Sequence, residues 1–297
     1  MLTGSLVAIV TPMAADGGID WPAWDRLLDF HVREGTQGVV VAGTTGESPT
    51  LSSDEVEALT ARAVARCKGR IRVIAGAGTN ATASTVARTR TLSKLGVDAV
   101  MLVTPYYNKP TQEGLYRHFA AAADVSEAPI IVYNVPSRTA VDLLPATIGR
   151  LARHGRIQSV KDATGSVTRA RETLGLVPSD FTLLSGDDAT AVELMCAGAR
   201  GVISVTANVA PRRMRDACDA AAAGDHARAR AIDQTLRALH QELFVESSPT
   251  PVKWAVARMG LIGNAIRLPL VELSAAHQDG VLRAMSAAGV NLEDQAA

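Results

Sequence analysis

The stretch "GVVVAGTTGESPTLSSDEVEALTARAVARC", residues 38–67, contains one complete strand–loop–helix unit. Its first part is continuously apolar and β-branched, which is typical of a strand covered on both faces. The polar, glycine-rich loop "GTTGES" follows. Ser52 then precedes Glu55 by three residues, which is the spacing of a helix-capping box. The stretch therefore predicts a strand that enters a helix through a short loop.

The same unit recurs along the chain. Helices are expected between the strands, for example over residues 82–96 and 211–224. Eight units predict an α/β fold, a (β/α)8 TIM barrel over residues 1–224. A doubly wound open sheet is the alternative, but no G-x-G-x-x-G follows the first strand. The other seven strands are expected to begin at Ser5, Arg72, Ala99, Pro129, Ile157, Phe181 and Gly201.

The pattern changes after Gly224, where strand-like runs stop. Residues 226–244, 249–260 and 269–289 have the composition of helices. We therefore expect a small C-terminal three-helix domain over residues 225–297, after the barrel.

Composition excludes several classes of protein. Hydrophobic residues make up 47% of the chain, and 30 acidic residues balance 30 basic ones, so no basic field attracts nucleic acid. The N-terminus lacks the basic region of a signal peptide. No apolar run approaches the roughly 18 residues of a membrane span. Three scattered cysteines and six histidines without metal-binding spacing favour a reduced, cytoplasmic protein with no metal and no cofactor.

Polar residues gather at the expected carboxyl ends of the strands, where a TIM barrel places its active site. Three of the four tyrosines lie there, namely Tyr106, Tyr107 and Tyr133. Each feature also has a structural explanation. The Tyr106–Tyr107 pair could serve packing or an interface, and Arg138 could be a solvated loop residue. Asp187–Asp188 could cap a helix.

Lys161 is harder to explain by structure alone. The chain has only five lysines among its 30 basic residues, and this one lies in the apolar run "IQSVKDATG". It could extend along the strand end to solvent. If it is buried instead, its pKa falls, and a neutral amine can form a Schiff base with a ketone. Such an imine supports an aldol addition or its reverse without a metal.

The neighbouring motifs supply the other groups that this chemistry needs. Tyr133, on the adjacent strand, is the natural general acid and base, and Thr44 and Tyr107 can extend a hydroxyl relay to water. Thr45 and the backbone N–H groups of "GTTG" can bind the carboxylate of a 2-oxo acid. Arg138 suits the carboxylate of a second substrate, since its guanidinium binds carboxylates through two hydrogen bonds.

Five motifs in this order, "GTTGES", "TPYYNKP", "YNVPSRT", "KDATG" and "GVISVTAN", resemble the 4-hydroxy-tetrahydrodipicolinate synthase (dihydrodipicolinate synthase) family. This family belongs to the class I pyruvate-dependent aldolase and N-acetylneuraminate lyase superfamily. The resemblance implies that Lys161 forms a Schiff base with pyruvate. It also implies that Tyr133 moves protons together with Thr44 and Tyr107.

The resemblance further implies the substrate contacts and the assembly. Thr45 would bind the pyruvate carboxylate, the backbone of Ile203 would line the pyruvate site, and Arg138 would bind aspartate 4-semialdehyde. Tyr107 would come from the neighbouring subunit of a dimer, within a homotetramer that is a dimer of dimers. The product would feed diaminopimelate and lysine synthesis.

Two alternatives stay open from the sequence. One is a related pyruvate-dependent aldolase acting on N-acetylneuraminate or a 2-keto-3-deoxy sugar acid. The other is a catalytically silent protein that binds 2-oxo acids. One departure also matters, because Ser53, Val56 and Ser84 stand where lysine-inhibited members carry histidines and a glutamate. We therefore predict weak or absent inhibition by lysine.

Overall fold

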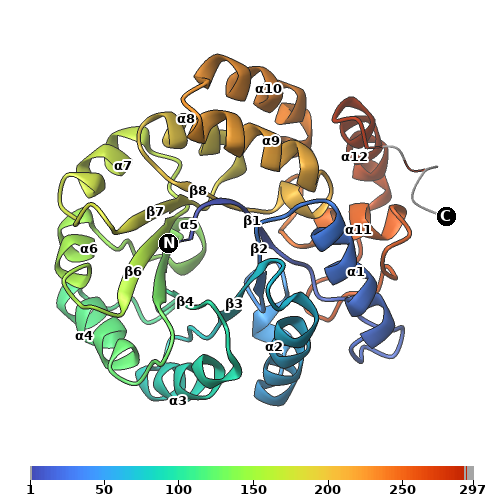
Figure 1. The fold of residues 1–297 in the computed structure, drawn as a ribbon. Helices are drawn as coiled ribbons and strands as arrows, with labels where there is room; N and C mark the ends of the chain where they lie inside the picture. Colours follow the sequence, from blue (N-terminus) through green and yellow to red (C-terminus); the bar gives the residue numbers. More distant parts are fainter. Residues whose placement is uncertain (1, 291, 293–297) are drawn as a thin grey trace.

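The computed structural model describes residues 2–290 and 292, and its centre is a closed barrel of eight parallel strands (Figure 1). Strand β1 closes the barrel by pairing with both β2 and β8. The predicted (β/α)8 barrel is confirmed, and each predicted strand start lies within one residue of the observed one. The strands are β1 Gly4–Ala8, β2 Gly38–Val41, β3 Arg72–Gly76, β4 Ala99–Val103, β5 Ile130–Asn134, β6 Ile157–Asp162, β7 Thr182–Ser185 and β8 Gly201–Ser204.

Helices surround the barrel as an outer ring, except for the short α5 directly after β5, which lies near the centre of the view (Figure 1). The capping box before α2 is confirmed. The Ser52 side chain accepts a hydrogen bond from the Glu55 N–H at 3.1 Å, and the Glu55 carboxylate accepts one from the Ser52 N–H at 2.8 Å. The helices are α1 Trp21–Arg33, α2 Ser53–Cys67, α3 Thr82–Leu92, α4 Gln112–Ala123, α5 Pro136–Thr139, α6 Pro145–Leu151, α7 Val167–Leu174, α8 Ala191–Cys196 and α9 Pro211–Ala222.

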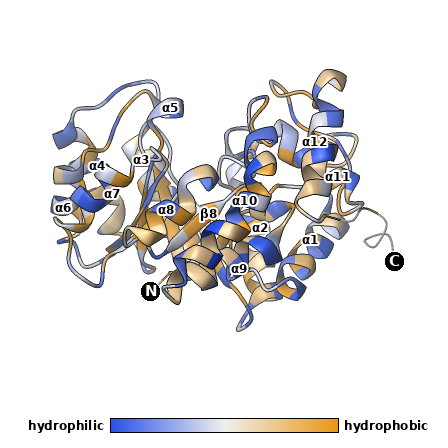
Figure 2. Ribbon diagram, turned by 90° about the horizontal axis from the view of Figure 1, so that it is seen from above, coloured by the Kyte–Doolittle hydropathy of each residue, from blue (hydrophilic) through white to orange (hydrophobic). Residues whose placement is uncertain are grey.

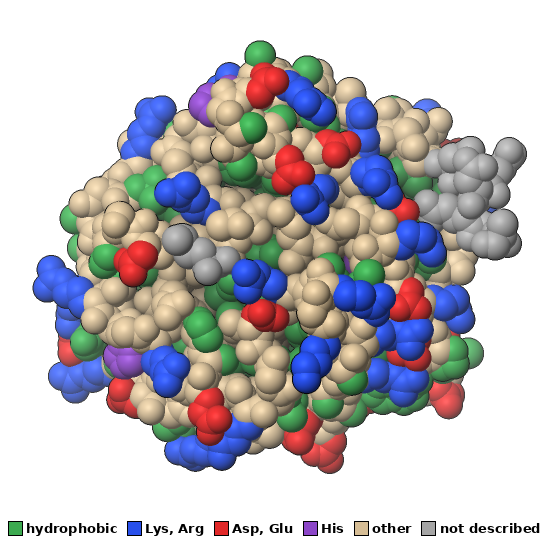
Figure 3. All heavy atoms as spheres, in the orientation of Figure 1, with side chains coloured by type: hydrophobic (Ala, Val, Ile, Leu, Met, Phe, Trp, Pro, Cys, Tyr) green, Lys and Arg blue, Asp and Glu red, His purple; other side chains and the backbone are tan. Residues whose placement is uncertain are grey.

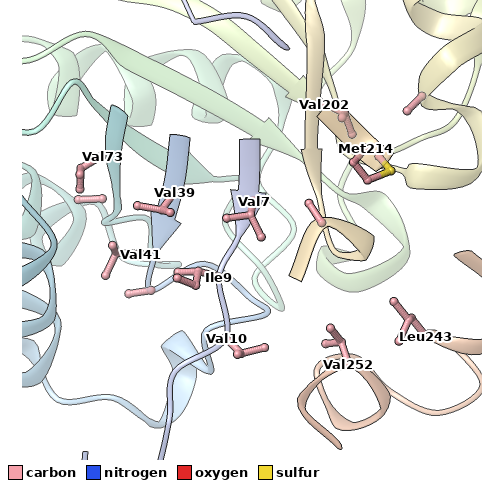
Figure 4. Close-up of a cluster of buried hydrophobic side chains, with 14 of the residues drawn as sticks. Val7, Ile9, Val10, Val39, Val41, Val73, Val202, Met214, Leu243 and Val252 are labelled. Carbon is pink, nitrogen blue, oxygen red and sulfur yellow. The ribbon is translucent and has the colours of Figure 1, made fainter. Parts of the chain in front are cut away.

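The core has two layers, because side chains alternate between the two faces of each strand. One layer fills the inside of the barrel, and the other lies between the strands and the helices. Figure 4 shows members of the outer layer, and Figure 2 shows apolar colouring on the strands with hydrophilic segments on the outer helices. The inner layer includes Leu6, Val40, Ile74, Met101, Ile131, Tyr133, Leu184 and Ile203.

Three helices follow the barrel, as expected: α10 His226–Glu242, α11 Thr250–Arg258 and α12 Ala275–Ala287. Helix α10 packs against α9 of the barrel. Figure 4 shows Val10 from the barrel on the side where Leu243 and Val252 of the C-terminal segment lie, and all three are buried. The division at residues 224 and 225 stays a prediction.

One predicted helix was placed too early. Residues 269–274 are not helical, and α12 begins at Ala275. The carbonyl of Val271 accepts a hydrogen bond from the Thr250 hydroxyl at 3.2 Å, a tertiary bond to another element. The Val271 side chain is 61% exposed, so the apolar residues of this stretch do not form the buried face of a helix.

The spacing of the six histidines is compatible with helix surfaces and ends, but three of them are buried in the structure. His31, His118 and His240 are buried, and the Nδ1 atom of each lies within hydrogen-bond distance of a threonine hydroxyl. Burial lowers the pKa of His31 to about 3 and that of His118 to about 4. These two imidazoles are therefore neutral parts of the core at physiological pH.

Charged side chains of both signs are intermingled on the face drawn in Figure 3. Among residues 2–290 and 292, no helix is long and apolar enough to cross a membrane. Within the same part of the chain, no three histidine, cysteine or acidic residues gather in a way that could hold a metal ion.

Candidate active site

Lys161 points into the barrel. In the register of the sheet it pairs with Tyr133 on β5 and with Leu184 on β7, and both partners belong to the inner core layer. The Lys161 Nζ atom lies 4.1 Å from the centroid of the Tyr133 ring, and the residue is 5% exposed. The alternative of a lysine that extends to solvent is therefore wrong.

Burial lowers the pKa of Lys161 from 10.5 to about 7. The Asp188 carboxylate acts in the opposite direction, and the Arg138 guanidinium lowers the pKa further. Close packing also fixes the side chain, since a Cβ atom placed on Gly186 would lie 3.0 Å from Lys161 Cε. At neutral pH a large fraction of this amine carries no proton and has a free lone pair.

Tyr133 stays protonated at neutral pH. Burial raises the pKa of its hydroxyl to about 12, although Arg138 and a hydrogen bond with the Thr44 side chain act to lower it. A protonated hydroxyl next to an amine can donate a proton and recover it through a hydroxyl partner. The Thr44 side chain lines the same cavity as Tyr133.

A cavity of about 310 Å³ opens at the carboxyl ends of the strands. It is lined by side chains from the loops after several strands, as in other TIM barrels. The cavity reaches Tyr133, whose ring Lys161 contacts. Its polar lining includes Thr44, Thr79, Tyr106, Arg138 and Arg88.

Of the predicted site residues, Thr44, Tyr133 and Arg138 line this cavity, and Lys161 lies against the Tyr133 ring without lining the cavity itself. Thr45 is buried and Ile203 lies in the inner core layer, and neither lines this cavity. Tyr107 is 88% exposed and is also absent from the cavity wall. Tyr106, which the sequence did not assign to the active site, is the tyrosine of that pair that lines the cavity.

The loop that carries Thr44 is a compact turn. The Gly46 N–H donates to the Gly43 carbonyl at 3.1 Å, and the Glu47 N–H donates to the Thr44 carbonyl at 3.1 Å. A Cβ atom on Gly46 would lie 3.1 Å from the Ile9 carbonyl oxygen, so a larger residue would be crowded at this position. The local backbone therefore holds the two threonines at the end of β2.

The alternative explanation, that Asp187 and Asp188 cap the helix that follows them, is not supported, because Asp187 occupies the N-cap position of the turn Asp188–Thr190 without a side-chain cap hydrogen bond. Asp188 instead accepts hydrogen bonds from the backbone N–H groups of Val205 at 2.8 Å and Thr206 at 2.9 Å. Its buried charge acts on Lys161, as described above. The available signal was an acidic residue at a barrel strand end, beside the strand of the lysine.

The dihydrodipicolinate synthetase family model matches residues 1–288. The chain belongs to this family. Among its relatives, the 4-hydroxy-tetrahydrodipicolinate synthase of Methylococcus capsulatus is 53% identical over 290 residues, which cover 98% of this chain and 100% of that protein. The synthase of Pseudomonas aeruginosa is 53% identical over 98% of this chain and 99% of its own length.

Solved structures of family members match equally well. The chloride-inhibited dihydrodipicolinate synthase of Acinetobacter baumannii, complexed with pyruvate, has a TM-score of 0.96 and 46% identity, covering 98% of this chain and 100% of that one. The Aquifex aeolicus enzyme has a TM-score of 0.95 and 42% identity, over 97% of this chain and 99% of its own. Both the barrel and the C-terminal helices therefore belong to the family fold.

Proposed function

We propose that this chain is a 4-hydroxy-tetrahydrodipicolinate synthase, which condenses pyruvate with L-aspartate 4-semialdehyde in diaminopimelate and lysine biosynthesis. The observation that carries the proposal is the buried Lys161 amine, with a pKa near 7, against the ring of Tyr133. Membership of the family over residues 1–288 supports the choice of substrates.

In the first half-reaction, the neutral Lys161 amine attacks the C2 carbonyl of pyruvate. The oxygen leaves as water after proton transfers that the Tyr133 hydroxyl relays, and an imine remains. The iminium is an electron sink, so C3 of pyruvate loses a proton and becomes an enamine carbon. Thr44 accepts and returns the proton of Tyr133, since both side chains line the cavity and the Thr44 side chain acts on the pKa of Tyr133.

In the second half-reaction, the enamine carbon attacks the aldehyde carbon of aspartate 4-semialdehyde, and the resulting alkoxide takes a proton. The amino group of that substrate then attacks the imine carbon. The bond to Lys161 Nζ breaks, a ring imine forms, and the lysine returns as a free amine. No external oxidant or reductant is consumed.

The remaining binding roles follow the same proposal. Thr45 and the backbone of its loop bind the pyruvate carboxylate, and the backbone of Ile203 lines the pyruvate site. Arg138 lines the cavity and binds the carboxylate of aspartate 4-semialdehyde. Its cationic head also disfavours a proton on Lys161, so one residue serves binding and amine activation.

Tyr107 is proposed to act in a neighbouring subunit of an oligomer. Its side chain is 88% exposed and its backbone φ is +75°, a conformation that few non-glycine residues adopt without a reason. We propose a homotetramer, a dimer of dimers, in which Tyr107 completes the hydroxyl relay of the neighbouring subunit. The proposed location is the cytoplasm, where the free thiols of Cys67, Cys196 and Cys218 stay reduced.

Weak inhibition by lysine also stays part of the proposal. Val56 lines the cavity and Ser53 and Ser84 lie on neighbouring helices, so these positions offer a lysine ammonium no carboxylate. Half-inhibition below millimolar lysine would contradict this expectation.

The function is tested by incubating the enzyme with pyruvate and aspartate 4-semialdehyde and following both substrates and product by mass spectrometry. We expect condensation by the wild type and none by Lys161→Met. Cleavage of N-acetylneuraminate or a 2-keto-3-deoxy sugar acid, without condensation of the semialdehyde, would assign the chain to the related aldolases instead.

A further inference from the structure

A buried ion pair lies outside the residues that the reaction uses. Glu47, in the loop after β2, is 2% exposed, and Lys253, on α11, is 1% exposed. The Lys253 Nζ atom donates to one Glu47 carboxylate oxygen, and the Arg267 N–H donates to the other at 3.1 Å. Buried charges are expensive unless they are paired, so this arrangement requires both partners.

Glu47 also has an unusual backbone. Its φ is +59°, in the left-handed region, where a side chain is strained by about 1–3 kcal/mol. In this conformation its N–H reaches the Thr44 carbonyl at 3.1 Å, and its own carbonyl accepts from the Thr50 N–H at 3.0 Å. A glycine would adopt the same turn without strain. The hydrogen bonds of the Glu47 carboxylate therefore offset the strain of this backbone conformation, which a glycine at the same position would avoid.

The partners of the Glu47 carboxylate, Lys253 and Arg267, both come from the C-terminal part of the chain. The Arg267 side chain also donates to the carbonyls of Gly17 at 2.8 Å and Thr50 at 2.7 Å. Just before α11, the carbonyl of Ser248 accepts from the Arg138 guanidinium at 3.2 Å. The segment 248–267 thus holds both the threonine loop and the arginine of the active site.

We propose that the Glu47–Lys253 pair is a positioning device that lets the C-terminal segment set the affinity of the threonine loop for the 2-oxo acid carboxylate. The pair touches no substrate and takes no part in proton transfer. It fixes residues 43–48 so that Thr44 faces Tyr133 and the loop N–H groups converge on the carboxylate. This inference rests on the proposed function, because it assigns that carboxylate to pyruvate.

The test compares Glu47→Gln, Lys253→Met and the charge-free double variant Glu47→Met/Lys253→Met. Pyruvate is titrated in the presence of borohydride, and the half-saturating concentration for adduct formation is read by mass spectrometry. We expect this concentration to rise roughly tenfold to 100-fold in all three variants. The maximal adduct yield should stay that of the wild type, since Lys161 is unchanged. Thermal unfolding is measured in parallel.

The double variant separates positioning from stability. Replacing both charges by apolar side chains of similar volume leaves no unpaired buried charge and is often neutral for stability. It therefore also supplies the comparison if a single variant fails to fold. A double variant with wild-type thermal stability but weak pyruvate binding supports positioning. A double variant that restores wild-type half-saturation would overturn the proposal.

Glu193→Gln is the matched control, since it breaks an exposed ion pair between α8 and α10, in which Arg230 Nε lies 2.6 Å from a Glu193 carboxylate oxygen. It should leave the half-saturation unchanged. The two proposals fail in distinguishable ways. A wild type without any adduct refutes the proposed function, whereas a wild-type adduct with unchanged half-saturation in folded variants refutes this inference alone.

Discussion

The pKa of Lys161 gives a quantitative prediction about its reactivity. With a pKa of about 7, half of the amine is neutral at pH 7, whereas a lysine with the ordinary value of 10.5 is neutral in about one molecule in 3,000. The buried amine therefore has a reactive population roughly 1,500-fold larger. Between pH 6 and pH 8 its neutral fraction rises from about a tenth to about nine-tenths and then levels off.

Competitive acetylation with trace reagent at a series of pH values measures this directly. Peptide mass spectrometry reports each of the five lysines separately, and the surface residue Lys94 serves as an internal standard. We expect labelling of Lys161 to rise with a midpoint near pH 7 and to level off above pH 8. Steric protection lowers the absolute rate at Lys161 but does not move its midpoint.

Two variants test the cause of this pKa. Asp188→Asn removes a charge that raises the pKa, so the midpoint should fall below that of the wild type. Arg138→Met removes a charge that lowers the pKa, so the midpoint should rise. A wild-type midpoint near pH 10 would show that burial does not lower the pKa of Lys161. Midpoints that move in the reverse directions would show that Asp188 and Arg138 do not act on this pKa as described.

Three further predictions concern the same site. Tyr133→Phe should lower kcat roughly 100-fold to 10,000-fold, because the proton-transferring hydroxyl is lost. The pyruvate adduct should still be detectable, because the Lys161 amine remains. An unchanged kcat in steady-state assays would contradict this prediction. Gly186→Ala should destabilise the fold by about 1–3 kcal/mol in urea titrations and should slow adduct formation. The reason is that the new Cβ atom would lie 3.0 Å from Lys161 Cε. Unchanged stability and an unchanged rate would count against tight packing at this position. Lys161→Met should raise the free energy of unfolding by up to about 4 kcal/mol at pH 7. Between pH 7 and 10.5 the unfolded wild type binds more protons than the folded form, so wild-type stability rises with pH. The stability gained by the methionine variant should therefore shrink towards zero over this range. A gain that grows with pH would contradict this prediction.

The sequence predicts the barrel well because its strands are short, apolar and evenly separated by helices. Parallel strands buried on both faces leave such runs, and the loops after them carry the polar residues. Lys161 and Tyr133 could be paired in advance because neighbouring strands in a barrel share a register. The observed pairing of these two residues confirms that step.

Other features depend on contacts that sequence spacing does not encode. Asp188 looks like a helix cap, but tertiary folding brings it to the backbone of Thr206 instead. Glu47 and Lys253 are 206 positions apart, so only the closed structure reveals their pairing. The spacing of the three buried histidines is compatible with helix surfaces, and only the folded structure brings a threonine hydroxyl to the Nδ1 atom of each.

The identity of the imine-forming residue decides whether Lys161 performs the proposed chemistry. The enzyme is incubated with pyruvate at pH 8, reduced with borohydride, digested and mapped by mass spectrometry. We predict one reduced pyruvyl group per chain, on Lys161, and none on the buried Lys253, whose amine is paired with Glu47. An unmodified Lys161, or an adduct on a different lysine, would show that Lys161 is not the imine-forming residue.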